Sequence, residues 1–170
     1  MSELSSPEIR ALTEQLAAAD VEQRAAAAER LSQAGASAAP AAPQLVRACG
    51  DGDERVREWA VAALEDLGPP SRTAIDPLIK LATDPEPLTA YWAITLLGRS
   101  GQDASSAVTV LATCVESSSA DPSVRQRAAW ALGQIGPTAA AARAALERAA
   151  GQPDPRLARL ATEALAAIGS

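Results

Sequence analysis

The sequence contains no histidine and no phenylalanine, and its only aromatic residues are three tryptophans and one tyrosine. Histidine is the commonest general base and the commonest metal ligand in proteins, so its absence removes much acid–base and metal-dependent chemistry. Glycine-rich phosphate loops, serine nucleophile motifs and CxxC cysteine pairs are absent as well. We therefore expect a protein that is not an enzyme and that holds no metal and no cofactor.

Cysteine and basic residues are also scarce. The two cysteines, Cys49 and Cys114, are widely separated, which favours buried small apolar residues over a disulfide. The net charge of −6 opposes a nucleic-acid surface, which needs clustered Lys and Arg. No apolar run could span a bilayer, and residues 1–20 lack a basic segment followed by an apolar core. The sequence predicts a soluble, non-secreted, cytoplasmic protein that binds neither nucleic acid nor membrane.

Alanine, by contrast, is abundant, with 42 residues, and it follows a repeated pattern. The clearest copy is DPSVRQRAAWALGQIG, in which Asp-Pro starts a helix, apolar residues recur on one face, and glycine ends it. This frame of sixteen residues occurs five times, with alanine always eighth and leucine always twelfth. The copies, which we call first-type helices, are Asp20–Gly35, Asp53–Gly68, Glu86–Gly101, Asp121–Gly136 and Asp154–Gly169.

A weaker amphipathic segment, which we call a second-type helix, precedes each first-type helix. These segments are Ser5–Ala19, Ala39–Cys49, Ser71–Ala82, Asp103–Val115 and Thr138–Ala150. They share one leucine position, occupied by Leu12, Leu45, Leu78, Leu111 and Leu146. A fixed period with matching apolar positions indicates a stacked array of helix pairs. Because the linkers are short, we expect one continuous domain over residues 1–170.

The first-type frame, with DP, VR, AA, ALG and IG in that order, resembles the short HEAT-like repeat of phycobilisome-lyase-type proteins. The resemblance covers nearly the whole chain. It implies an all-α fold, a right-handed α-solenoid of five two-helix repeats and ten helices, with first-type helices on the convex layer. Repeat three departs most from the frame, because Glu86 replaces Asp, Ala90 replaces Arg and Ser100 replaces an apolar residue; repeat five has Ala158 in place of Arg.

Three repeats combine an Asp in the first position with an Arg in the fifth. A ladder of anion-binding sites would fit this spacing. We favour a structural role, in which each Asp caps its own helix and each Arg bridges to an Asp of the same or a neighbouring repeat. The pairs are Asp20 with Arg24, Asp53 with Arg57, and Asp121 with Arg125.

The aromatic residues fall into two groups. Trp59 and Trp92 share a position at the edge of the buried face in consecutive repeats, and we expect them to pack between repeats. Tyr91 and Trp130 lie on the opposite side of their helices, where exposed aromatic residues suggest a partner-binding patch. A Trp lying flat over an alanine-rich surface explains this second position equally well.

Positions opposite the leucines of the second-type helices define a concave ridge, which includes Arg10, Arg47, Asp76, Lys80 and Arg148. The ridge is locally more basic than the whole protein and suits an acidic segment of a partner protein, although solvated side chains fit the pattern as well. We predict a non-catalytic scaffold or adaptor that binds an unidentified partner protein on this ridge or on the aromatic patch. The alternative, implied by the resemblance alone, is an accessory subunit of a bilin lyase or a similar protein-modifying enzyme.

The last first-type helix has a broad apolar sector with no following helix to cover it. The sector includes Leu157, Leu160, Leu165 and Ile168. We predict that it contacts a second copy, a partner or further chain, because terminal repeats need a polar outer face. In light scattering the wild type should associate and Leu160→Glu should not. A wild type that is monomeric at every concentration, unaltered by the charge, would remove self-association.

Overall fold

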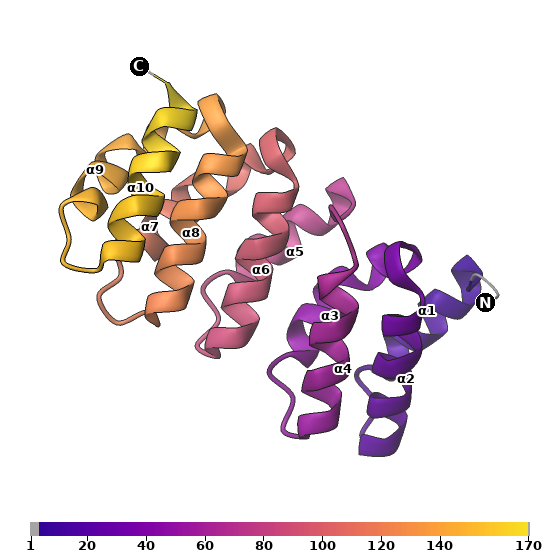
Figure 1. The fold of residues 1–170 in the computed structure, drawn as a ribbon. Helices are drawn as coiled ribbons and strands as arrows, with labels where there is room; N and C mark the ends of the chain where they lie inside the picture. The colour runs from indigo at the N-terminus through magenta and orange to yellow at the C-terminus, as the bar shows by residue number, and fades with distance from the viewer. Residues whose placement is uncertain (1–3, 170) are drawn as a thin grey trace. The chain divides into compact units, whose positions relative to one another are not determined.

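The computed structural model describes residues 4–169, which form helices and contain no strand (Figure 1). The two predicted helix types alternate along these residues, which confirms the all-α fold built from helix pairs. The first-type helices are α2 (Val21–Gln33), α4 (Glu54–Glu65), α6 (Pro87–Arg99), α8 (Pro122–Ile135) and α10 (Pro155–Ile168). The second-type helices are α1 (Ser6–Gln15), α3 (Ala42–Ala48), α5 (Ile75–Leu81), α7 (Val108–Glu116) and α9 (Arg143–Ala150).

The helix pairs group into two compact units, the first ending at Pro77 and the second beginning at Leu78. In the first unit, α2 packs against α1 and α4, and α3 packs against α4. In the second unit, α8 lies between α6 and α10, with α7 and α9 behind them (Figure 1). Each unit therefore has one layer of first-type helices and one of second-type helices. A single domain over residues 1–170 stays a prediction.

A glycine in the left-handed region follows every first-type helix. A side chain at such a φ is strained, which explains why the frame always ends in glycine. The φ values are +52° at Gly35, +72° at Gly68, +55° at Gly101, +72° at Gly136 and +80° at Gly169.

Short 3₁₀ helices lead from these glycines toward the second-type helices. They are η1 (Gly35–Ala41), η2 (Arg72–Ala74), η3 (Gly101–Ala107) and η4 (Gly136–Ala142). Their apolar residues continue the pattern of the helix that follows, so the sequence prediction started those α-helices too early. The segment predicted from Thr138, for example, becomes α-helical only at Arg143.

Aspartate carboxylates cap four of the first-type helices. Asp20, Asp53, Asp121 and Asp154 accept hydrogen bonds from the backbone N–H two residues later, at 3.3, 3.0, 2.8 and 3.0 Å. In repeat three Glu86 makes no such bond, and its own backbone N–H donates to Asp84 at 3.0 Å. Repeat two makes the same loop bond, from the Asp53 N–H to Asp51 at 2.9 Å, so the departure of repeat three removes the side-chain cap and keeps this bond.

The core consists of small and large apolar residues at the predicted positions. The alanines in the eighth position of the frame are fully buried, and so are four of the five leucines in the twelfth. The leucine position of the second-type helices is also buried, with at most 3% exposure. Cys49 and Cys114 are buried and free, as predicted. Burial raises the pKa of the Cys49 thiol to about 12 and also raises the pKa of the Cys114 thiol.

The apolar sector predicted on the last helix is narrower in the structure. Leu157 and Ile168 are buried, with 0% and 6% exposure, while Leu160 and Leu165 are half-buried. The expectation of a broad open sector is corrected, because α10 packs against both α8 and α9 and not against one neighbour. Self-association through Leu160 and Leu165 stays a prediction.

Replacing Leu111 of α7 with alanine should lower the free energy of unfolding by about 2–5 kcal/mol. Leu111 has 0% exposure, so the change removes buried methyl groups and leaves a cavity. Urea denaturation followed by circular dichroism measures the effect, and Leu160→Ala at a half-buried position is the matched control. Equal losses in the two variants would contradict the assignment of the core.

Candidate functional site

The arginines in the fifth position of the frame donate hydrogen bonds to oxygen atoms of the loops between helices. Arg24 makes two bonds to the Asp51 carboxylate, at 2.8 and 3.0 Å, and two to the carbonyl oxygens of Ala18 and Ala19, at 2.9 and 3.0 Å. Its side chain is only 19% exposed. The carboxylate it binds is that of a loop residue, not the helix-capping Asp20 of its own repeat.

The other two fifth-position arginines, Arg57 and Arg125, also bind protein oxygens, but of different residues. Arg57 donates to the carbonyl oxygens of Asp51 and Gly52, at 2.8 and 3.1 Å. Arg125 donates to the Val115 carbonyl at 3.0 Å and to the Gln152 amide oxygen at 2.5 Å. These bonds occupy the guanidinium groups with the protein's own oxygens, which favours a structural role over anion binding.

A different arginine lies at the centre of the candidate site in the second unit. Arg127 of α8 lies between two aromatic rings, with its Cζ atom 4.4 Å from the centroid of Tyr91 and 4.8 Å from that of Trp130. It also donates a hydrogen bond to the Tyr91 hydroxyl. Guanidinium groups over aromatic faces are attracted by the negative charge of the π system. We call Tyr91, Arg127, Trp130, Arg156 and Arg159 the cationic patch.

Trp130 reaches this position because α6 carries a glycine opposite it. A Cβ atom built on Gly98 would lie 2.4 Å from Cζ3 of the Trp130 indole. The indole therefore packs on the backbone of α6, and Trp130 is half-buried. Tyr91 is also half-buried and meets Trp92 edge to face, with ring centroids 5.9 Å apart. The two aromatic residues predicted as a patch are thus brought together, but they are less exposed than expected.

The charge of Arg127 has no acidic counterpart. Among residues 4–169, no carboxylate lies within ion-pair distance of its guanidinium. Burial, and then the positive charge of Arg156, lower the pKa of Arg127. Arginine titrates so far above neutral pH that the group nevertheless stays protonated. Among the described residues, the half-buried Arg127 guanidinium is therefore held by the rings of Tyr91 and Trp130 and by the Tyr91 hydroxyl.

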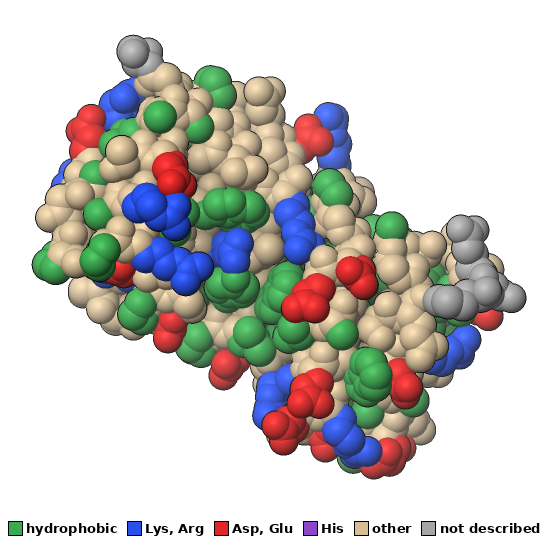
Figure 2. Space-filling view, viewed as in Figure 1, with side chains coloured by type: hydrophobic (Ala, Val, Ile, Leu, Met, Phe, Trp, Pro, Cys, Tyr) green, Lys and Arg blue, Asp and Glu red, His purple; other side chains and the backbone are tan. Residues whose placement is uncertain are grey.

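The patch opens to solvent through a shallow cavity of about 220 Å³. Ser123, Gln126 and Leu160 complete its lining. Figure 2 shows Lys and Arg side chains gathered over α8 and α10, with hydrophobic side chains beside them. Residues 78–170 contain eight basic and eight acidic residues, whereas residues 1–77 contain seven and thirteen. The acidic excess of the protein thus belongs to the first unit, and the patch lies in the neutral second unit.

Sequence reasoning found the aromatic residues of the patch and missed its arginines. Arg127 occupies the frame position that Trp59 and Trp92 hold in other repeats, where a charge has no obvious role. The available signal was its spacing of three residues from Trp130, which places both side chains on one side of α8. Contact with Tyr91, on another helix, could not be read from spacing.

The residues predicted to form the concave ridge are all exposed. Arg148, at one end of the series, forms an ion pair with Glu116, so its charge is partly neutralised. Surface ion pairs of this kind contribute little stability. Arg10, Arg47, Asp76 and Lys80 remain candidates for contacts with a partner.

The two tryptophans that share a frame position have different environments. Trp92 is 7% exposed, with Arg99 5.7 Å from its ring centroid. Trp59 is 38% exposed, so the expectation that it packs between repeats is corrected. The same frame position is exposed at Ala26 and half-buried at Arg127 and Leu160. Burial at this position therefore differs from repeat to repeat.

Comparison with known proteins identifies the repeats. A family model for HEAT repeats matches residues 9–87 and 114–170. The chain belongs to the HEAT-repeat family. The resemblance inferred from the first-type frame is thereby confirmed. No curated protein matches this chain.

Several solved structures share the fold of this HEAT-repeat protein. An engineered protein is 24% identical, with a TM-score of 0.64, and the match covers 95% of this chain and 79% of the engineered chain. A designed armadillo repeat protein in complex with the peptide (KR)4 is 20% identical, with a TM-score of 0.64 and coverages of 92% and 80%. The complex of CpcE and CpcF of phycocyanin lyase from Nostoc sp. PCC7120 is 22% identical, with a TM-score of 0.65 and coverages of 99% and 66%. At these identities the likeness shows the α-solenoid fold.

Within residues 4–169, no helix is both long and apolar enough to cross a membrane. No group of three or more Cys, Asp or Glu side chains in the same range could hold a metal ion.

The Arg24–Asp51 bridge gives a prediction about pH. The hydrogen bonds from Arg24 hold the pKa of Asp51 below its usual 3.8. The bridge therefore contributes stability above about pH 4, and this contribution is lost as the pH falls through the lowered pKa. Asp51→Asn should lower the free energy of unfolding at pH 7 by about 1.5–3 kcal/mol, measured in urea. Its stability should also fall less than that of the wild type between pH 5 and pH 2.

Asp66→Asn makes the same chemical change at an exposed residue and should leave both quantities nearly unaltered. If the two variants behave alike, the bridge contributes nothing measurable.

Proposed function

We propose that this protein is an interaction scaffold that binds a partner protein through the cationic patch of its second unit. The observation that carries this proposal is the half-buried Arg127 guanidinium, which lies between Tyr91 and Trp130 with no acidic partner among the described residues. A carboxylate supplied by a partner would add a charge-assisted hydrogen bond to this group. Arg, Trp and Tyr are also the residues that contribute most energy at protein interfaces.

The same features favour binding over catalysis. A guanidinium that stays protonated at neutral pH cannot take up or release a proton during a reaction. The remaining polar lining residues, Ser123 and Gln126, donate to the carboxylates of Asp121 and Asp154 at 2.6 and 2.8 Å. Both carboxylates already cap helices, and the chain has no histidine to act as a general base. A non-catalytic scaffold therefore fits the patch better than an enzyme does.

Capture from a lysate of the source organism, followed by calorimetry with the purified partner, tests this proposal. Arg127→Gln and Arg156→Gln should each weaken binding at least about tenfold, which corresponds to about 1.4 kcal/mol. Wild-type binding should weaken with added salt, because the contact is between opposite charges. Arg30→Gln removes one exposed positive charge from the first unit and is the matched control.

The ridge is the competing surface, and its triple variant Arg47→Ser, Lys80→Ser and Arg148→Ser belongs in the same experiment. Full binding by both patch variants together with loss in the triple variant would move the interface to the ridge. Salt-independent binding that none of these changes affects would exclude both surfaces.

The accessory-subunit alternative has support only from the family resemblance and from the shared fold of the CpcE and CpcF complex. An absorption titration of the purified protein with a bilin separates it from the scaffold proposal. A tight stoichiometric complex would favour the alternative, and an unchanged bilin spectrum would favour the scaffold.

A further inference from the structure

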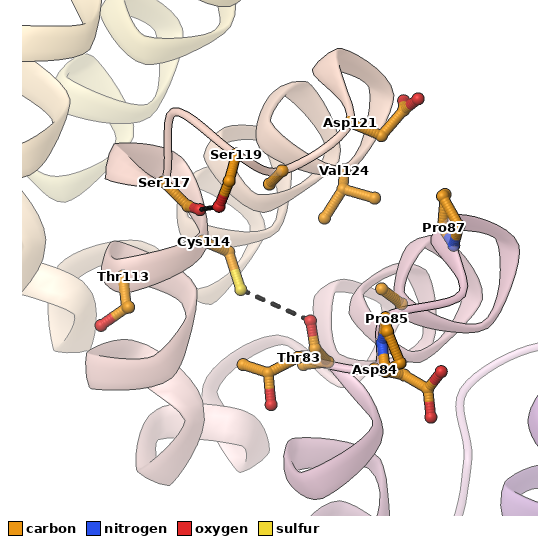
Figure 3. A pocket seen from close by; sticks show the side chains of 13 residues that line it. Thr83, Asp84, Pro85, Pro87, Thr113, Cys114, Ser117, Ser119, Asp121 and Val124 are labelled. Carbon is orange, nitrogen blue, oxygen red and sulfur yellow. Dashed lines mark hydrogen bonds between the residues drawn. The ribbon is translucent and has the colours of Figure 1, made fainter.

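The second unit contains a pocket of about 280 Å³ at the loop ends of α6 and α8 (Figure 3). One wall is the loop before α6, which includes Thr83, Asp84 and Pro85, and the opposite wall is the loop before α8, which includes Ser117 and Ser119. The Cys114 thiol at the base donates to the Ala82 carbonyl at 3.5 Å. Ala90 of α6 also lines the pocket and is 2% exposed.

Ala90 occupies the fifth position of the frame, where repeats one, two and four have arginine. Two of these arginines bind the carbonyl oxygens six and five residues earlier in the sequence. Arg24 binds those of Ala18 and Ala19, and Arg57 binds those of Asp51 and Gly52. The equivalent residues for position 90 are Asp84 and Pro85, and both line the pocket. Among the described residues, no hydrogen bond reaches either of these two carbonyl oxygens.

The opposite wall of the pocket shows the same correspondence. Arg24 binds Asp51 and Arg125 binds Gln152, in each case a residue 27 positions later. Asp51 and Gln152 each lie two residues before the capping Asp of the next first-type helix. The loop after repeat three is two residues longer, so the equivalent residue before Asp121 is Ser119, whose side chain also lines the pocket. The pocket therefore has the walls of an arginine site, with a methyl group where repeats one, two and four have an arginine side chain.

We propose that this pocket binds an arginine side chain of a partner protein. The aliphatic part of the side chain packs between Pro87 and Val124, and the guanidinium donates to the carbonyl oxygens of Asp84 and Pro85 and to the Ser119 hydroxyl. Arginine fits better than lysine, because one guanidinium nitrogen binds both carbonyl oxygens in Arg24 while the others remain available for a second wall. Asp84 and Asp121 also line the pocket, and their negative charge favours a cation.

A shallow groove joins this pocket to the cationic patch. It shares Pro87 and Asp121 with the pocket, and Tyr91 and Ser123 with the patch. One segment of a partner could therefore place an arginine in the pocket and an acidic residue against Arg127. The inference rests on the proposed function in taking the occupant to be part of a protein.

The test uses wild-type protein labelled with ¹⁵N and N-acetylarginine N-methylamide as the probe. Saturable shifts are expected for the amides of Asp84, Ser117 and Ser119. The lysine analogue should bind several-fold more weakly, and the uncharged norleucine analogue should give no saturable shift there. Absence of shifts with the arginine probe, or equal shifts with norleucine, would overturn the proposal.

Ala90→Arg supplies the missing side chain from within the chain and should abolish the shifts produced by the probe. Ala158→Arg adds the same charge at the same frame position of repeat five and should leave them intact. Retained probe binding by folded Ala90→Arg would place the probe elsewhere and contradict the inference. If Ala90→Arg does not fold, the comparison of the three probes on the wild type decides alone.

Failure here and failure of the proposed function are distinguishable. Arg127→Gln should leave the probe shifts at the pocket unchanged, because Arg127 does not line it. An arginine pocket that binds the probe while Arg127→Gln leaves partner binding intact would support this inference and contradict the proposed function of the patch.

Discussion

Close packing of small side chains between neighbouring helices is the constraint on which the rest of this structure depends. The alanines of the eighth frame position are fully buried, and a Cβ atom on Gly133 would lie 3.2 Å from the Cα atom of Ala164. The leucines of the twelfth frame position and of the second-type helices are buried in the same core, and they provide large apolar side chains in a chain without phenylalanine. The tryptophans differ in burial: Trp92 is buried, Trp130 is half-buried and Trp59 is exposed.

The departures of repeat three from the frame have local consequences that fit together. Replacement of Arg by Ala90 removes the side chain that binds the loop in repeats one, two and four, and Ser119 occupies the position of its acidic or amide partner. Gly98 in the same repeat admits the Trp130 indole, which in turn holds Arg127. The pocket therefore arises where repeat three departs from the frame, whereas Gly98 keeps the glycine that repeat four also has at Gly133.

Sequence periodicity predicted the helix types, their order, the buried leucines and the terminal glycines, because each depends on residues close together in the chain. It located Tyr91 and Trp130 but not their contact through Arg127, which joins residues 36 positions apart. It also predicted too wide an exposed apolar sector on the last helix. Periodicity does not show that α10 packs against two helices, α8 and α9. The 3₁₀ segments were hidden for another reason: spacings of three suit both kinds of helix.

The uneven distribution of charge between the two units affects how fast a partner arrives. Residues 1–77 carry all of the net charge of −6, and residues 78–170 carry none. An acidic partner is repelled by the first unit at distances up to the Debye length, about 8 Å at physiological ionic strength, and meets no such net repulsion at the second. Under the proposed function, the acidic first unit would therefore direct an acidic partner toward the unit that holds Arg127.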